Sequence, residues 1–211
     1  KIILVMTAVL VVLPAAYFFF AEFSAWQPAQ RIFASLFQAI TPRTAGFNTA
    51  SFSAMKDGSI AVLIVLMLIG GAPGSTAGGI KTSTVFVLIQ GIKSAATNHT
   101  EKAFHYAIPK GAFRKASVIT ILGGSIVFVC TYLLSILEPQ IPLTDLLFES
   151  VSAFGTVGLS TGITTQLCTA SKLLCILVMY IGRLGPLTIF SIWHYTLGER
   201  VRYPEGNISI G

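Results

Sequence analysis

Charged side chains are scarce in this chain. Fourteen lysines and arginines and eight aspartates and glutamates make up 10% of its 211 residues, whereas hydrophobic residues make up 54%. A soluble domain of ordinary composition carries about a quarter charged residues, so the scarcity excludes that class. The mean hydropathy of +0.78 predicts instead a membrane protein, with lipid as its surroundings.

Cysteine and histidine, with three residues each, are also rare. None stands at metal-ligand or C-x-x-C spacing, so we interpret the cysteines as core residues and assign no role to His99, His105 or His194. The net charge of +6 does not predict nucleic-acid binding, because the cations gather in residues 93–115 and at the C-terminus. We expect no catalytic residues, no transition metal, no cofactor and no nucleic-acid partner.

Two long apolar runs, Ile2–Ala21 and Ala116–Leu137, each match the ~20 residues that a helix needs to cross a bilayer. After each run comes a short amphipathic segment that opens on proline, at Pro28 and at Pro142. Fourteen residues of helix span only about 21 Å, which is too short to cross. Each short segment must lie on the surface or enter the membrane and return.

The segments that follow the short helices resemble each other. "TAGFNT" begins at Thr44 and "TVGLST" at Thr156, and glycine and proline interruptions open at Gly70 ("GGAPG") and at Gly182 ("GRLGP"). Both pairs are 112 residues apart. The sequence therefore predicts two tandem units, 1–112 and 113–211, each made of a transmembrane helix, a re-entrant helix with a loop, and a broken transmembrane helix.

The third element of the first unit is an apolar run, Ser59–Ile92, that would span about 51 Å as one helix. It must be interrupted or project into the cytoplasm. Non-helical backbone at membrane depth persists only where it contacts protein or water, so a glycine-rich break indicates a pathway. The cations between the units and at Arg200 and Arg202 predict a cytoplasmic connector and C-terminus, with both short helices entering from outside.

The break itself, "GGAPGSTAGGIKTST" from Gly70 to Thr84, has glycines, a lysine and hydroxyls like a phosphate-binding loop. In a Walker A motif the lysine follows the last glycine directly, but here Ile80 separates Gly79 from Lys81. The slipped lysine and the apolar surroundings disfavour a nucleotide-hydrolysing enzyme.

A helix that ends in mid-membrane points its carbonyl dipoles toward the centre, and an extended T-x-G backbone can replace the hydration shell of a cation. The alternative is an ordinary glycine turn between helices. Because the pattern occurs twice in the same context, we favour two ion-filter loops. The predicted filter residues are Thr44, Ala45, Gly46, Phe47, Asn48, Thr156, Val157, Gly158, Leu159 and Ser160.

These motifs resemble the Trk/Ktr/HKT superfamily of potassium transporters, whose membrane subunit contains four helix, pore-loop, helix units. "TPRTAGFNTASF" is similar to the third pore loop, "APGSTAGGIKT" to an intramembrane gating loop, and "SAFGTVGLSTGIT" with "GRLGPLT" to the fourth unit. The tail "RYPEGNISIG" is most similar to the Ktr-type membrane subunit. The resemblance implies an all-α, potassium-channel-like fold and a chain that is the C-terminal half of a longer protein.

The resemblance also implies roles for the break and for Arg183. The break becomes a gate beneath the filter, and Arg183 becomes a pore charge below it. Alternatively, Lys81 is a lysine that snorkels to the interface, Arg183 pairs with Glu149, and Asp145 with Glu149 lends the entrance a cation-attracting field. The predicted gate residues are Gly70, Gly71, Ala72, Pro73, Gly74, Ser75, Thr76, Ala77, Gly78, Gly79 and Lys81.

The resemblance implies potassium uptake across the plasma (inner) membrane, with no enzymatic activity. The expected partners are a missing N-terminal half with two further pore loops, a second copy in a homodimer, and a cytosolic nucleotide-binding ring of the RCK type. Both loops depart from the potassium-channel signature at their last two residues, Phe47-Asn48 and Leu159-Ser160, so sodium stays a second candidate ion. An ion-coupled secondary transporter with broken helices is the alternative.

Overall fold

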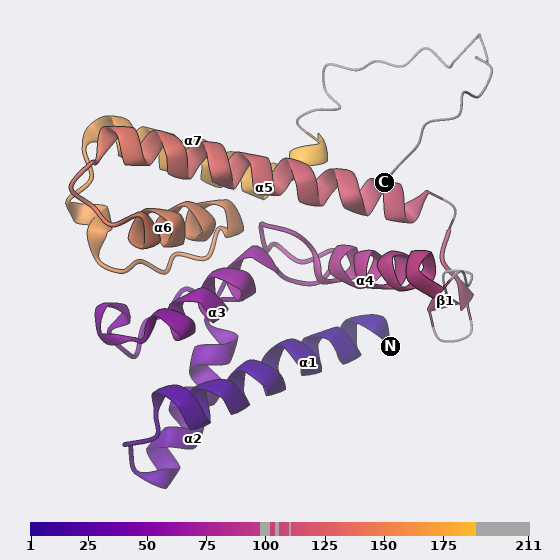
Figure 1. The fold of residues 1–211 in the computed structure, drawn as a ribbon, viewed down its shortest axis with the longest axis horizontal. Helices are drawn as coiled ribbons and strands as arrows, with labels where there is room; N and C mark the ends of the chain where they lie inside the picture. Colours follow the sequence, from indigo (N-terminus) through magenta and orange to yellow (C-terminus); the bar gives the residue numbers. More distant parts are fainter. Residues whose placement is uncertain (98–101, 104–105, 110, 189–211) are drawn as a thin grey trace.

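The computed structural model describes residues 1–97, 102–103, 106–109 and 111–188. The predicted cytoplasmic tail with Arg200 and Arg202 lies outside these ranges, as do the three histidines. The described chain is mostly helical and falls into two units with the same order of elements (Figure 1).

The first unit contains a long helix, a short helix and a helix in two pieces. Its elements are α1 (Ile2–Tyr17) with the π-turn η1 (Phe18–Glu22), α2 (Pro28–Ile40), the turn η2 (Phe52–Ala54), α3 (Asp57–Leu68) and α4 (Thr82–Thr97). Pro28 occupies the first turn of α2, where its missing N–H costs nothing. The predicted interruption of the long apolar run is confirmed, because α3 ends at Leu68 and α4 begins only at Thr82.

The second unit has the same order as far as the start of its last helix, which is continuous from Thr169 to Leu184. Its elements are α5 (Ala112–Leu137), α6 (Leu143–Gly155), the turn η3 (Ile163–Thr165) and α7 (Thr169–Leu184). The predicted boundary between the units falls at the start of α5. Between the units, β1 (Lys102–Ala103) pairs with β2 (Tyr106–Ala107) as a short antiparallel hairpin. The rest of the described secondary structure is helical, so the predicted all-α class is confirmed.

One predicted break is displaced. We expected Gly182 to open the interruption of the last helix, but α7 continues through Gly182 to Leu184. The helical conformation ends at Gly185, which has φ of +87° and precedes Pro186. A single helical glycine costs only about 1 kcal/mol relative to alanine, whereas the residue before a proline is driven out of the helical region.

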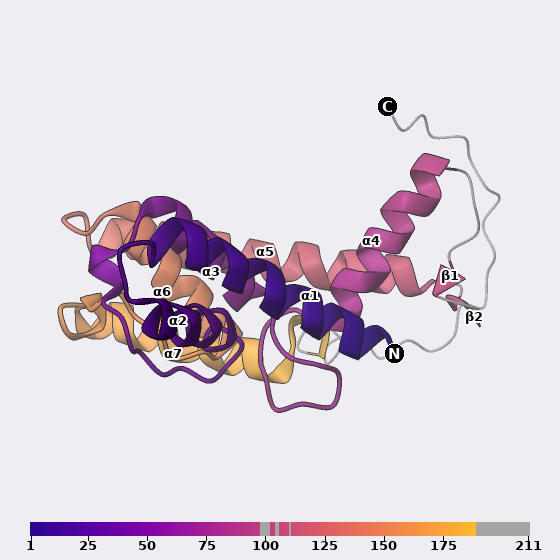
Figure 2. The same ribbon diagram turned by 90° about the horizontal axis from the view of Figure 1, so that it is seen from below.

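The short helices and the connector lie at opposite ends of the molecule. In Figure 1, α5 and α7 run side by side, α6 lies beneath them, and α2 lies at the same end of the view as α6. The hairpin β1/β2 and the end of α4 are at the other end. Seen from below, α4 rises away from the layer formed by α1, α3 and α5 (Figure 2).

Two helical stretches, Ile2–Glu22 and Ala112–Leu137, are long and apolar enough to cross a membrane. Their outer faces carry large apolar side chains without protein cover, such as Leu4, which is 74% exposed, and Phe128, which is 72% exposed. Buried side chains of α3, α5 and α6 form the common core, among them Met67, Leu134 and Phe154. Such helices are compatible with lipid, because their backbone polar groups bond within the helix and their apolar outer faces need no cover by protein.

A carboxylate ties the first helix of each unit to the start of the last one. Glu22 ends η1, and its Oε2 accepts a hydrogen bond from the Ser59 hydroxyl in the first turn of α3 at 2.6 Å. Glu138 follows α5, and its Oε1 accepts from the Ser171 hydroxyl in the first turn of α7 at 2.9 Å. Ser59 and Ser171 are 112 residues apart, which is the period of the repeat.

The second of these carboxylates also caps a helix. The backbone N–H of Cys168, the residue before α7, donates to Glu138 Oε1 at 2.6 Å. This bond and the Ser171 hydroxyl bond lower the pKa of Glu138 below its ordinary value. A negative charge at a helix N-terminus is also favourable for the helix dipole.

Candidate functional site

The two predicted filter loops have the same unusual backbone. Thr44 and Thr156 are the two non-glycine residues with positive φ in the described chain, at +68° and +52°. Two residues later, Gly46 and Gly158 have φ of +73° and +92°. Side chains rarely adopt this region, so the glycines are required there by conformation. The T-x-G pattern therefore encodes one loop geometry, used twice.

The two loops meet at their glycines. A Cβ placed on Gly46 would lie 2.3 Å from the Val157 carbonyl oxygen, and one placed on Gly158 would lie 3.9 Å from Gly46 Cα. At Gly46 only glycine permits this approach, because real Cβ atoms do not come within 3.0 Å of another heavy atom, whereas the distance at Gly158 is an ordinary contact. Residues from the two predicted filter loops are thus brought together.

The loops differ in their surroundings. In the first, Phe47 and Asn48 are exposed, and the Phe47 carbonyl accepts a hydrogen bond from the Thr41 hydroxyl at 2.5 Å. That carbonyl points back at the end of α2. In the second loop, Val157 and Leu159 are buried against the core.

The predicted gate, Gly70–Gly79 with Lys81, lies within residues 69–81, which form a loop whose two ends run parallel where they pair at Ile69 and Ile80; we call this segment the glycine loop. Its base is closed by three backbone bonds, from Gly70 N to the Ile80 carbonyl at 2.9 Å, from Ile80 N to the Leu68 carbonyl at 3.0 Å, and from Thr82 N to the Gly71 carbonyl at 3.1 Å. The base is mostly buried and the tip, 73–76, is exposed. Paired backbone accounts for the persistence of this break inside an apolar run.

Lys81 is held within the glycine loop. Its ammonium donates to the Ala77 carbonyl and lies 3.4 Å from the Ser75 carbonyl oxygen. A Walker-type lysine is free to reach phosphates. Here the positive charge is occupied by the carbonyls of its own loop, which further disfavours a nucleotide site.

The glycine loop contacts the second filter loop directly. The N–H of Gly78 donates to the Thr156 hydroxyl at 3.1 Å. A Cβ on Gly78 would lie 2.7 Å from that hydroxyl oxygen and 2.9 Å from the Gly155 carbonyl oxygen, so glycine is required by the close packing. The predicted gate and the second predicted filter loop are therefore in direct contact.

Arg183 contacts the tip of the glycine loop. Its guanidinium donates to the Thr76 carbonyl. The alternative pairing with Glu149 is wrong, because Glu149 Oε1 accepts instead from the Thr164 hydroxyl at 2.5 Å. The two residues lie at different levels of their helices: Glu149 is in the middle of α6 (Leu143–Gly155), whereas Arg183 is in the last turn of α7.

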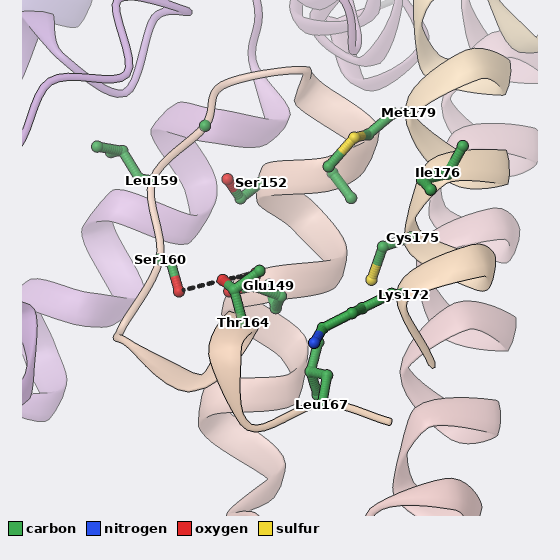
Figure 3. Close-up of a pocket in the computed structure, with 12 residues that line it drawn as sticks. Glu149, Ser152, Leu159, Ser160, Thr164, Leu167, Lys172, Cys175, Ile176 and Met179 are labelled. Carbon is green, nitrogen blue, oxygen red and sulfur yellow. Dashed lines mark hydrogen bonds between the residues drawn. The ribbon is translucent and has the colours of Figure 1, made fainter. Parts of the chain in front are cut away.

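A cavity of about 360 Å³ lies behind the second filter loop, between that loop, α6 and α7 (Figure 3). Glu149, Ser160, Thr164, Lys172, Cys175 and Met179 are among its lining residues. Glu149 is only 8% exposed, so it does not act as a surface charge at an entrance, whereas Asp145 is half-buried.

Sequence reasoning included Thr156 among the filter residues but did not predict the contact of its hydroxyl, and it missed Thr164. The Thr156 hydroxyl bonds to the glycine loop, and the Thr164 hydroxyl, in the turn η3 after the second filter loop, bonds to Glu149. No spacing rule pairs these residues, because each contact depends on how a loop returns to its helix. In the described part of the chain, no three His, Cys, Asp or Glu side chains cluster as metal ligands.

Known proteins are similar to this chain in sequence and in fold. The profile of the TrkH family, described as "Cation transport protein", matches residues 1–194. The chain is 40% identical over 182 residues to the Ktr system potassium uptake protein B of Bacillus subtilis, covering 86% of this chain and 41% of that protein. It is 36% identical over 190 residues to the potassium/sodium uptake protein NtpJ of Enterococcus hirae, covering 86% and 42%.

A solved structure, the potassium transporter TrkH from Vibrio parahaemolyticus, has the same fold with a TM-score of 0.74 and 20% sequence identity. The match covers 92% of this chain and 43% of that one. The chain thus spans about two fifths of the length of the curated relatives it matches.

Proposed function

We propose that this chain, which belongs to the TrkH family of cation transport proteins, forms two of the four walls of a pore for potassium uptake. The contact between Gly46 and Gly158 carries the proposal. Two T-x-G loops with matching backbone lie side by side, so their carbonyls can line a common path. The B. subtilis relative is named a potassium uptake protein, in agreement with this cargo.

Two loops cannot surround an ion. We infer that two further pore loops belong to the part of the protein that precedes residue 1, since the relatives are more than twice as long as the matched segment. The first filter loop, with Phe47 and Asn48 exposed, presents the surface where such loops would dock.

The glycine loop is proposed as the gate of this pore. It touches Thr156 through Gly78 and Arg183 through Thr76, so it lies between one filter loop and the cytoplasmic half of α7. Its tip is exposed and is held to α7 by the Arg183 bond, while its paired base holds the loop in position. A displacement of the tip would open the path that the loop obstructs.

Sidedness, partners and the choice of ion belong to the same proposal. The connector and the C-terminus are assigned to the cytoplasm, where a homodimer would dock on a ring of nucleotide-binding RCK-type subunits. The printed name of the B. subtilis relative refers to a Ktr system. Sodium stays a second cargo, because the E. hirae relative is named a potassium/sodium uptake protein.

The decisive experiment uses the parent, by which we mean the full-length protein that contains this chain. It replaces Gly158 by serine and measures the relative permeability of potassium and sodium. We expect the preference for potassium to fall roughly tenfold, the equivalent of about 1.4 kcal/mol, because a side chain at positive φ distorts the carbonyls. Gly111→Ser is the matched control: Gly111 also has positive φ, at +84°, a Cβ there meets nothing within 4 Å, and it lies before α5, outside both loops. Equal effects of both substitutions would contradict the filter assignment.

A further inference from the structure

A chain of hydrogen bonds connects the end of the second filter loop to α6. The N–H of Gly162 donates to Ser160 Oγ at 3.0 Å, Ser160 Oγ lies 2.8 Å from Thr164 Oγ1, and Thr164 Oγ1 lies 2.5 Å from Glu149 Oε1. A hydroxyl has one proton and a carboxylate only accepts. Thr164 therefore donates to Glu149, and Ser160 donates to Thr164. Figure 3 shows Glu149, Thr164 and Ser160 joined in this order.

The inner end of this chain is a buried carboxylate. Glu149 is 8% exposed, and its second oxygen, Oε2, is buried with no hydrogen-bond partner among the described residues. A buried charge is costly unless it is hydrogen-bonded or paired, so its bond to Thr164 is of the strong, charge-assisted kind. Lys172 lines the same cavity and brings a positive charge to this side of the loop.

The first filter loop has no equivalent chain. At the period of 112 residues, the positions that correspond to Glu149, Ser160 and Thr164 hold Phe37, Asn48 and Phe52. Two of these side chains are hydrocarbon and form no such bonds. The hydrogen-bond chain is therefore a property of the second loop alone, which indicates a specific role there.

We propose that Glu149 and Thr164 are positioning residues that determine ion preference by fixing Ser160, and with it the carbonyls around Gly158. A flexible loop adjusts its carbonyls to either ion, whereas a loop held at its outer end keeps one spacing. Glu149 acts through Thr164 and touches no ion. The inference rests on the proposed filter, so its test must separate the two.

The test measures the potassium-to-sodium permeability ratio of the full-length parent in proteoliposomes. Thr164→Val and Glu149→Leu break the hydrogen-bond chain, and we expect each to lower the ratio roughly fivefold or more, because each removes a charge-assisted bond. Thr164→Ser keeps the hydroxyl and Glu149→Gln keeps an acceptor oxygen, so both should retain most of the preference. A permeability ratio does not depend on how much protein is incorporated.

Asp145→Asn is the matched control for charge. Asp145 lies one helical turn before Glu149 on α6, so its loss changes the local field without touching the chain. A ratio that falls equally in Asp145→Asn and Glu149→Gln would overturn the proposal in favour of a field effect. A normal ratio in Thr164→Val would also overturn it, provided that Gly158→Ser lowers the ratio. A normal ratio in Gly158→Ser would instead contradict the proposed filter itself.

Discussion

Gly182 decides how closely α7 approaches the end of α6. A Cβ at this position would lie 1.9 Å from the Phe154 carbonyl oxygen and 2.8 Å from the carbonyl carbon, which no real side chain permits. Phe154 precedes Thr156 by two residues, so this contact also sets the position of the second filter loop. The glycine that we expected to break the helix serves close packing instead.

Gly182→Ala should therefore destabilise the protein. Because the neighbour is backbone, α7 must shift, and we expect a loss of about 1–3 kcal/mol in unfolding free energy. The measurement is the thermal unfolding midpoint of the purified parent in detergent. Gly124→Ala in α5 is the control, since a Cβ there meets nothing within 4 Å and should change stability by less than about 1 kcal/mol.

An unchanged unfolding midpoint for Gly182→Ala would show that α7 can shift relative to α6 without a loss of unfolding free energy. A fall of the same size in Gly124→Ala would point to a general sensitivity of helical glycines. Either outcome would remove the argument that Gly182 places the loop.

At the scale of elements, the glycine loop is closed at its base by a parallel backbone pairing between Ile69 and Ile80. Its base is held by backbone bonds of 2.9–3.1 Å. Its tip is bonded to Arg183 through Thr76, and Gly78, which follows the tip, is bonded to Thr156. An element with a rigid base and few outer contacts can change position as a unit. This is the property that a gate requires.

Deleting residues 72–79 removes the tip and the two contacts of the glycine loop, from Thr76 to Arg183 and from Gly78 to Thr156. We expect the parent with this deletion to take up potassium faster and with less dependence on its cytosolic regulator, while the preference for potassium is retained. Lys81→Ala should act in the same direction more weakly, because it removes the bonds to the Ala77 and Ser75 carbonyls but leaves the loop in place. Initial rates of potassium uptake, with and without the regulator, provide the measurement.

A deletion variant that reaches the membrane folded but conducts no faster would identify the loop as packing. The control is the filter preference, which must stay at its original value if the deleted residues are not part of the selective path.

The order of the elements was predictable because it follows from local rules. Apolar length gave α1 and α5, Pro28 marked the start of α2, and the glycine cluster marked the break after α3. The contacts within the site could not be predicted from the sequence. The end of α7, the bond of Arg183 to Thr76 and the link between Thr164 and Glu149 depend on which helices pack together, and no single segment encodes that choice.

At the scale of the whole molecule, the start of α7 and the end of α4 lie at opposite ends (Figure 1). Cys168 immediately precedes α7 and is exposed, and Lys93 lies in the last turns of α4 and is also exposed. If the proposed orientation holds, these two positions face different compartments.

An impermeant maleimide should therefore label Cys168 in intact cells. In a parent that carries Cys168→Ser and has no other reactive cysteine, Lys93→Cys should stay unlabelled until the membrane is permeabilised. Labelling of Lys93→Cys in intact cells, together with protection of Cys168, would invert the orientation.

The bond between Gly78 and Thr156 has a consequence for regulation. If the glycine loop moves as proposed, the Thr156 hydroxyl loses a donor, and the position of the loop and the conformation of the second filter loop would be energetically coupled. Coupling free energies are reciprocal. Whatever shifts Thr156 from the outer side, the arrival of a cation included, changes the opening equilibrium of the loop by the same factor. If the proposed function holds, external potassium would then act as an effector of the opening of the glycine loop.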